Sequence, residues 1–133
     1  MSEARTARFV VQKHAASHLH YDFRLEMDGV LRSWAIPKEP PTQPNIRRLA
    51  VEVEDHELSY IDFEGAIEKG QYGAGTVQIW DKGTYTLEDR KPDKIMFGLN
   101  GKHLNGDYVL LRFKQDKNWL FFKRKTEPKQ KKT

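Results

Sequence analysis

Nine residues near the N-terminus, 18–26, alternate strictly between polar and apolar side chains. In an extended strand, this alternation places the polar members on one face: His18, His20, Asp22, Arg24 and Glu26. Imidazole and carboxylate are ligands that a borderline divalent metal accepts, and arginine has the planar shape that holds a phosphate beside such a metal. The strand therefore predicts metal-assisted chemistry on an anionic substrate.

A plainer interpretation is a solvated strand face, on which histidine and aspartate are common. The clustering favours a site, because His14, His18 and His20 bring three of the five histidines within about seven positions. The opposite face is expected to enter the core through the apolar members of the run: Leu19, Tyr21, Phe23 and Leu25.

A second strand over residues 49–56 offers another histidine. His56 is in phase with Glu54, so alternation places it on a polar face, opposite the apolar positions Leu49, Val51 and Val53. Tyr60 follows four residues later. If the two polar faces converge, His56 and Tyr60 could donate hydrogen bonds to phosphate oxygens or act as general acid.

Strand patterns cover most of the chain, and no helix pattern is convincing. Asp28-Gly29 predicts a two-residue hairpin turn that leads into a strand over residues 30–36. Further turns are expected at Lys82-Gly83, Asn100-Gly101 and Asn105-Gly106, between strands over residues 76–81, 84–87, 94–99, 107–113 and 119–124. About eight short strands in one small domain predict an all-β, antiparallel β-barrel with the active site on a polar barrel face.

Composition limits the class of protein and the kinds of site that the chain can form. The 133 residues carry a net charge of +4 and no cysteine, which excludes disulfides and thiolate metal sites. Without a long apolar run or a signal peptide, we expect an intracellular, cytoplasmic protein with no membrane association, and a monomer. The expected organisation is a flexible N-terminal arm over residues 1–8, the barrel over 9–125, and a basic disordered tail over 126–133 that could add nonspecific attraction to phosphates.

Several motifs, taken in order, resemble the phosphoesterase domain of bacterial DNA ligase D, which acts in non-homologous end joining. They are Gln12-Lys13-His14, His20-Tyr-Asp-Phe-Arg-Leu25, Val53-Glu-Asp-His56, Tyr60-Ile-Asp-Phe-Glu-Gly65, Gly70-Gln-Tyr-Gly-Ala-Gly-Thr-Val77, Trp80-Asp81 and Gly83-Thr84. The resemblance covers residues 9–125. Because no polymerase or ligase sequence follows, the chain is similar to the freestanding family members of archaea and bacteria.

The resemblance implies a DNA 3′-end-healing enzyme on a β-barrel. Family members remove a terminal 3′-ribonucleoside and then the 3′-phosphate, leaving a 3′-hydroxyl for a separate DNA ligase. The implied partners are DNA 3′ ends that carry a 3′-phosphate or a 3′-ribonucleotide, and the favoured metal is Mn²⁺, with Co²⁺ or Zn²⁺ as alternatives. Only eight residues precede Phe9, where ligase D has a charged arm for ribonucleoside removal, so phosphate removal is the better supported activity.

By motif, the resemblance implies roles for ten residues. The metal ligands are His14, His20 and Asp22, and these act in catalysis together with Arg24, His56 and Tyr60, which lie around the phosphate. Further phosphate-binding positions are Gln12, Lys38 and Arg48, and the supporting acid is Glu54. His18 has no place in this set and is expected in solvent or behind the site. We expect Arg24 to hold the phosphate bidentately.

Two functions from other classes stay open on the residues alone. A cupin-like metal oxygenase or isomerase would use His18, His20 and Glu26, although the glutamate lies one pleat too far along the strand. A non-catalytic nucleic-acid-binding barrel would use aromatic stacking surfaces: Trp34, Tyr72, Trp80 and Tyr85. The cupin depends on His18 for its metal, whereas the phosphoesterase depends on His14.

Overall fold

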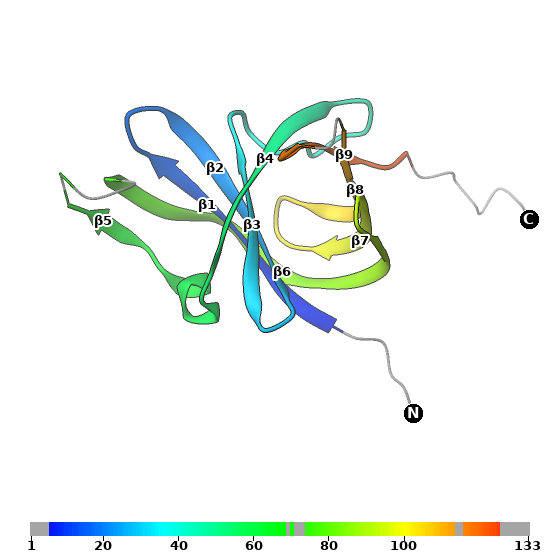
Figure 1. Ribbon diagram of the computed structural model, residues 1–133, viewed down its shortest axis with the longest axis horizontal. Coiled ribbons are helices and arrows are strands. Elements are labelled where there is room, and N and C mark those ends of the chain that lie inside the picture. Colours follow the sequence, from blue (N-terminus) through cyan, green and yellow to red (C-terminus); the bar gives the residue numbers. More distant parts are fainter. Residues whose placement is uncertain (1–5, 69, 71–73, 114–115, 126–133) are drawn as a thin grey trace, which may run out of the picture.

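A computed structural model of the protein describes residues 6–68, 70, 74–113 and 116–125. Its elements are β1 (Thr6–Ala15), β2 (Leu19–Met27), β3 (Val30–Ile36), β4 (Arg47–His56), the 3₁₀ helix η1 (Leu58–Asp62), β5 (Gly65–Ile67), β6 (Gly75–Lys91), β7 (Lys94–Asn100), β8 (Asn105–Arg112) and β9 (Asn118–Lys123). The antiparallel strand order is β1-β2-β3-β4-β9-β8-β7-β6, and β6 pairs back with β1. The predicted all-β barrel is therefore confirmed, with β5 added at the edge of β6 (Figure 1).

The hairpin turn at Asp28-Gly29 forms as predicted. Both residues have positive φ, 56° and 83°, which is the conformation of a type I′ turn. The turn fixes the register of β2 on β3, so that Arg24 lies opposite Ser33 and Asp22 opposite Ala35. On the other side of β2, His14 pairs with His20, so polar side chains of three strands share one face.

The barrel interior is apolar and rich in aromatic rings. Phe23 lies at its centre, with ring centroids 4.7 Å from Phe121 and 6.0 Å from Phe97. The predicted core face of β2 is confirmed for Tyr21, Phe23 and Leu25, but Leu19 is 48% exposed because it lies at the hairpin tip, opposite Ala15. A single core thus supports the strands whose other face carries the polar residues.

A smaller apolar cluster lies on the outside of the barrel. Val10 of β1, Leu31 of β3 and Ile61 of η1 are fully buried there, and Tyr60 packs against them. This contact fixes η1 over the outer face of β1 and β3, which is also the face of the polar residues. Figure 1 shows η1 and β5 at one side of the molecule and β7 and β8 at the other.

The predicted facing of β4 is wrong. Leu49 is 41% exposed and Ala50 is fully buried, so Leu49, Val51 and Val53 point outward and Ala50 points inward. Ser33 pairs with Val53, but Leu31 pairs with His56, which shows a bulge in β4 between these positions. The extra residue reverses the alternation. His56 therefore lies on the outer face with Val53, and not with Glu52.

Other turns and boundaries also differ from expectation. Lys82-Gly83 lies inside the continuous strand β6, where a Cβ on Gly83 would come within 2.2 Å of the Asn100 carbonyl oxygen. Asn105-Gly106 begins β8 and makes no turn, while η1 adds one short helix. β1 begins at Thr6, so residues 6–8 of the expected arm are strand; residues 1–5 and the tail over 126–133 lie outside the described residues. No helix in the described part of the chain is long and apolar enough to span a membrane.

Asp81 anchors the connection between β7 and β8. It is 3% exposed, and its carboxylate accepts backbone N–H groups of Lys102 at 2.7 Å, His103 at 3.0 Å and Leu104 at 2.7 Å. Gly101 packs directly against this carboxylate, because a Cβ at residue 101 would lie only 2.6 Å from Oδ2 of Asp81. Asp81 of the Trp80-Asp81 motif is thus explained by loop structure.

We expect Asp81→Asn to lower the free energy of unfolding by about 2–3 kcal/mol, because an amide oxygen accepts fewer and weaker hydrogen bonds than a buried carboxylate. Urea denaturation measures the change. Asp116→Asn is the matched control, since exposed Asp116 accepts one N–H, from its neighbour Lys117, and should change stability by less than about 0.5 kcal/mol. Equal stabilities of the two variants would contradict this account.

Candidate metal centre

Three side chains with metal-ligand chemistry converge on the outer face of the barrel, where β1 ends and β2 begins. His14, His20 and Asp22 each offer one ligand atom, and these atoms lie within 4.8 Å of one another. Nδ1 of His14 is 3.3 Å from Oδ2 of Asp22, and Nε2 of His20 is 3.3 Å from Oδ1. Two imidazole nitrogens and one carboxylate oxygen fit a divalent metal and leave coordination positions open. The side chains present therefore fit a catalytic metal site.

His20 and the carboxylate of Asp22 stabilise each other's charge. Burial alone would raise the pKa of Asp22, but the hydrogen bond with His20 and the positive charge of Arg24 lower it below the ordinary value. The hydrogen bond with Asp22 raises the pKa of His20, although partial burial opposes it. Asp22 is therefore ionised near neutral pH, which is the form that binds a metal.

A buried arginine lies beside this centre. Arg24 is only 3% exposed, and Nη2 lies 3.5 Å from Oδ2 of Asp22. Its Nε donates to Oε1 of Gln12 at 2.6 Å, and Nη1 donates to Oγ of Ser33 at 2.8 Å. Burial lowers the pKa of Arg24, but arginine stays charged in proteins. The result is a fixed positive charge next to the carboxylate.

Gln12 connects this arginine to η1. While its carbonyl oxygen accepts from Arg24, its amide nitrogen donates to the backbone carbonyls of Tyr60 at 2.9 Å and Phe63 at 3.2 Å. Gln12 is itself fully buried. It therefore lies beneath the site and orients both Arg24 and the segment that carries Tyr60.

His56 and Tyr60 cover the other side of the guanidinium. Nδ1 of His56 is 3.1 Å from Nη1 of Arg24. The ring centroids of His56 and Tyr60 are 4.8 Å apart, and the guanidinium carbon of Arg24 lies 5.0 Å from the Tyr60 ring centroid. Nδ1 of His56 faces two groups with opposite requirements, since the Arg24 guanidinium only donates and needs a lone pair there, whereas the Glu54 carbonyl oxygen, 3.2 Å away, needs an N–H. Burial, followed by the charge of Arg24, lowers the pKa of His56. Burial raises the pKa of Tyr60, so its hydroxyl stays protonated.

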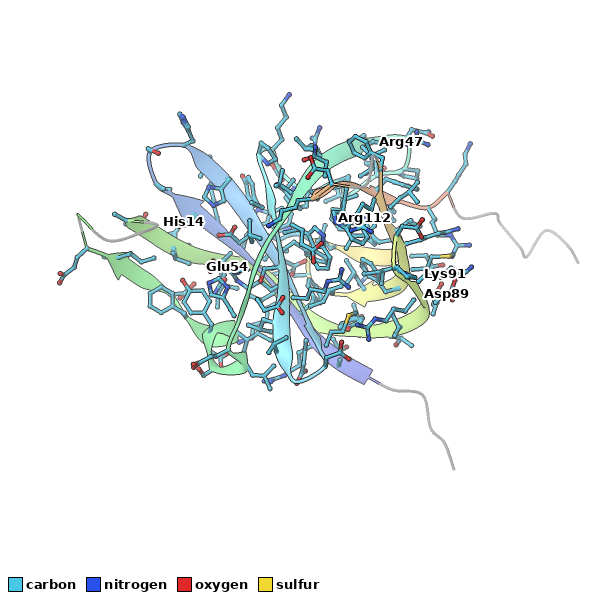
Figure 2. The ribbon with its side chains drawn as sticks, viewed as in Figure 1. His14, Arg47, Glu54, Asp89, Lys91 and Arg112 are labelled. Atoms are coloured by element: carbon cyan, nitrogen blue, oxygen red, sulfur yellow. The ribbon has the colours of Figure 1, made fainter. Side chains whose placement is uncertain are left out.

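These groups surround one cavity of about 390 Å³. Its lining residues are His14, Ala16, His20, Asp22, Arg24, Ala35, Val53, Glu54, His56, Tyr60 and Ile67. Figure 2 shows His14 and Glu54 at the same side of the molecule, far from Asp89 and Lys91. The cavity thus combines a metal-ligand cluster at one end with a buried cation and hydrogen-bond donors at the other, an arrangement suited to a phosphate group.

The structure does not bring every residue of the sequence-based set to the cavity. Lys38 is exposed in the loop after β3, and Arg48 donates through Nε to the Glu39 carbonyl at 2.7 Å. Gln12 lies behind Arg24, and His18 is exposed in the bend before β2. Neither Lys38, Arg48, Gln12 nor His18 lines the cavity.

Two supporting residues were not identified from the sequence. Ser33 holds Nη1 of Arg24, and the register of the Asp28-Gly29 hairpin, which pairs Arg24 with Ser33, contained the signal for it. Phe63 stacks on Tyr60 with ring centroids 4.9 Å apart. It follows the unpredicted helix η1, and no periodic pattern marks it.

The described residues that the alternative functions require are not arranged for them. Glu26 binds Arg8 at 3.1 Å and does not join His18 and His20 in a cluster. Trp34 and Tyr85 are buried in the core, and Trp80 is partly covered by His103 and Tyr21. Tyr72 lies outside the described residues.

Comparison with known proteins agrees with the resemblance. Residues 12–112 match the family described as the DNA Ligase D 3′-phosphoesterase domain. The chain is 54% identical over 110 residues to the multifunctional non-homologous end joining protein LigD of Pseudomonas aeruginosa, with 79% of the chain covered. It is 47% identical over 127 residues to the protein of the same name from Mycobacterium bovis, with 92% covered. The matches cover only 13% and 17% of those relatives' lengths.

We expect His20→Ala to weaken Mn²⁺ binding by about 10²-fold or more. Loss of a residue that only hydrogen-bonds to a metal ligand already reduces affinity by about 10- to 100-fold, and His20 would be a ligand itself. Titration calorimetry with MnCl₂ measures the affinity. His18→Ala is the matched control, since it removes an exposed histidine two residues away. Unchanged affinity in His20→Ala, or equal loss in His18→Ala, would contradict the assignment.

Proposed function

Because the chain belongs to the DNA ligase D 3′-phosphoesterase domain family, we propose that it is a metal-dependent DNA 3′-end-healing phosphoesterase that removes a 3′-phosphate and leaves a 3′-hydroxyl. The observation that carries the proposal is the cluster of His14, His20 and Asp22 beside the buried charge of Arg24 in one cavity. We propose Mn²⁺ as the metal, DNA 3′ ends as the substrate and a separate DNA ligase as the enzyme that uses the product.

The ligand set supports hydrolysis by water. A bound divalent ion would act as Lewis acid and lower the pKa of a coordinated water. His14, His20 and Asp22 would hold it through two nitrogens and one oxygen. The chain has no cysteine, and no serine of the described residues lines the cavity, so direct attack by water is favoured over a covalent intermediate on cysteine or serine.

Arg24 would stabilise the charge that develops on the phosphate oxygens. Its Nε and both protons of Nη1 are directed to Gln12, Ser33 and His56, and Nη2 also approaches Asp22. In this arrangement one N–H of Nη2 remains to donate to the substrate. The bidentate grip expected from the sequence would require one of these bonds to break, so we propose a single contact within a rigid charge cluster.

His56 and Tyr60 would supply further hydrogen bonds. We propose that the contact with Arg24 sets the tautomer, so that Nδ1 accepts and the neutral imidazole presents Nε2–H. The lowered pKa keeps the ring neutral near pH 7. The Tyr60 hydroxyl is also protonated there. We therefore propose that His56 acts as a neutral hydrogen-bond donor to the transferring phosphate, and not as the proton donor expected from the sequence.

Incubation of a 3′-phosphate-terminated DNA duplex with the protein and Mn²⁺ should release inorganic phosphate and leave a 3′-hydroxyl that a DNA ligase seals. A duplex ending in a single 3′-ribonucleotide, assayed in parallel, tests ribonucleoside removal. His20→Ala should be inactive and His18→Ala active. Absence of phosphate release by the unmodified protein across Mn²⁺, Co²⁺ and Zn²⁺ would overturn the proposed function.

For His56, long-range ¹H–¹⁵N NMR should show the Nε2–H tautomer at pH 7 and protonation below the ordinary pKa of 6.5. Since the charge of Arg24 contributes to this lowering, Arg24→Gln should raise the His56 pKa. His56→Ala should keep Mn²⁺ affinity and lose roughly 10²-fold or more in turnover, the size of a lost hydrogen-bond donor to the transition state.

Outcomes of two kinds would contradict the role of His56. A protonated imidazole at pH 7 would restore the proton-donor interpretation. Loss of Mn²⁺ affinity in His56→Ala would instead make His56 part of the metal centre.

A further inference from the structure

A second cavity, separate from the first, is lined mainly by cations. It measures about 290 Å³ and its lining residues are Asn45, Arg47, Phe122, Lys123, Arg124 and Lys125. Pairing of β4 with β9 places Arg47 opposite Phe122. The basic run at the end of the barrel therefore lies beside Arg47, a cation from at least 76 residues earlier in the chain. Among the described residues, no carboxylate lines this basic groove.

The groove shares the outer face of the barrel with the metal centre. Asp22 pairs with Ala35, and Ala35 with Val51, so two strand spacings of about 5 Å separate Asp22 from Val51. Arg47 lies four residues before Val51 on the same face, about 13 Å along the strand. Together these steps place the groove roughly 16 Å from Asp22, which is the rise of about five base pairs of DNA.

The geometry points to this groove as a binding surface for the phosphodiester backbone of DNA, several nucleotides away from the 3′ end in the metal centre. This inference rests on the proposed function for the position of that 3′ end. The groove would contact backbone phosphates other than the reacting one, because a row of cations attracts a polyanion.

Two cations of the groove are the best placed for this role. Arg47 lies over the Phe122 ring at 5.0 Å, so the ring supports the flat face of the guanidinium while its N–H edge can reach a phosphate. Lys125 is exposed. Arg124, by contrast, is paired with Glu88 at 3.2 Å, and Nζ of Lys123 lies 3.4 Å from the Thr42 carbonyl oxygen.

Binding of a fluorescein-labelled 12-base-pair duplex with 3′-hydroxyl ends tests the groove without any catalytic step. Fluorescence anisotropy is measured over a series of salt concentrations. Arg47→Gln and Lys125→Ala should each weaken binding about five- to tenfold near 0.1 M salt and reduce the slope of log K against log salt by about 0.9, the value of one phosphate contact. Lys91→Ala is the matched control, because it removes one exposed lysine that pairs with Asp89 on β6.

Thermal unfolding followed by circular dichroism checks that Arg47→Gln keeps the fold, and Lys125→Ala provides an independent variant at the end of the chain's described part. If both variants bind DNA as Lys91→Ala does, with the same salt slope, the inference is wrong. Equal losses in all three variants would show general attraction by net charge and would also overturn the groove.

Phosphate release separates this inference from the proposed function. On a 3′-phosphorylated duplex, Arg47→Gln and Lys125→Ala should lower kcat/KM by the same five- to tenfold, whereas on a 3′-phosphorylated dinucleotide, too short to reach the groove, they should match the unmodified protein. Inactivity of the unmodified protein on both substrates overturns the proposed function, and the anisotropy measurement then still decides the groove. Equal losses on both substrates overturn the groove alone.

Discussion

The buried charge of Arg24 is the constraint on which the site depends. A guanidinium that is 3% exposed is strongly destabilising unless its N–H groups and its charge are satisfied. The protein meets this requirement with partners from four segments: Gln12 of β1, Asp22 of β2, Ser33 of β3 and His56 of β4. The same contacts place His56 against the guanidinium, add to the His20 hydrogen bond in holding the carboxylate of Asp22 ionised and, through Gln12, fix η1. The requirement to solvate one buried cation therefore orients the whole cavity.

Backbone pairing delivers these partners without long loops. The two-residue turn at Asp28-Gly29 fixes Ser33 opposite Arg24, and the β1–β2 pairing fixes His14 opposite His20. Only His56 needs an irregular backbone, because regular alternation would place it on the face of Glu52. The bulge in β4 supplies the extra residue. A tight turn and a bulge, both local backbone features, thus determine which side chains meet.

The sequence predicted those parts of the molecule that depend on the alternation of side chains along a strand. Alternation in β2 identified both its core residues and the polar face that holds His20, Asp22 and Arg24, and turn chemistry identified the Asp28-Gly29 hairpin. It failed where tertiary packing decides. Leu49 was assigned inward because it is apolar, and Gly83 was assigned to a turn, whereas it allows close approach of Asn100 in a continuous strand. Neither a bulge nor a 3₁₀ helix leaves a periodic signal, so alternation placed His56 outward for the wrong reason and did not indicate the stacking of Phe63 on Tyr60.

Core and site are coupled because they occupy alternate positions of the same strands. Phe23, at the centre of the aromatic interior, lies between Asp22 and Arg24, and Trp34 lies between Ser33 and Ala35. A shift of one residue in the β2–β3 register would bury the polar side chains and expose these rings, which the loss of apolar burial forbids. The aromatic core therefore does more than stabilise the barrel. It holds the polar face in register, so that a rigid interior places the three candidate ligand atoms of the outer face within 4.8 Å of one another.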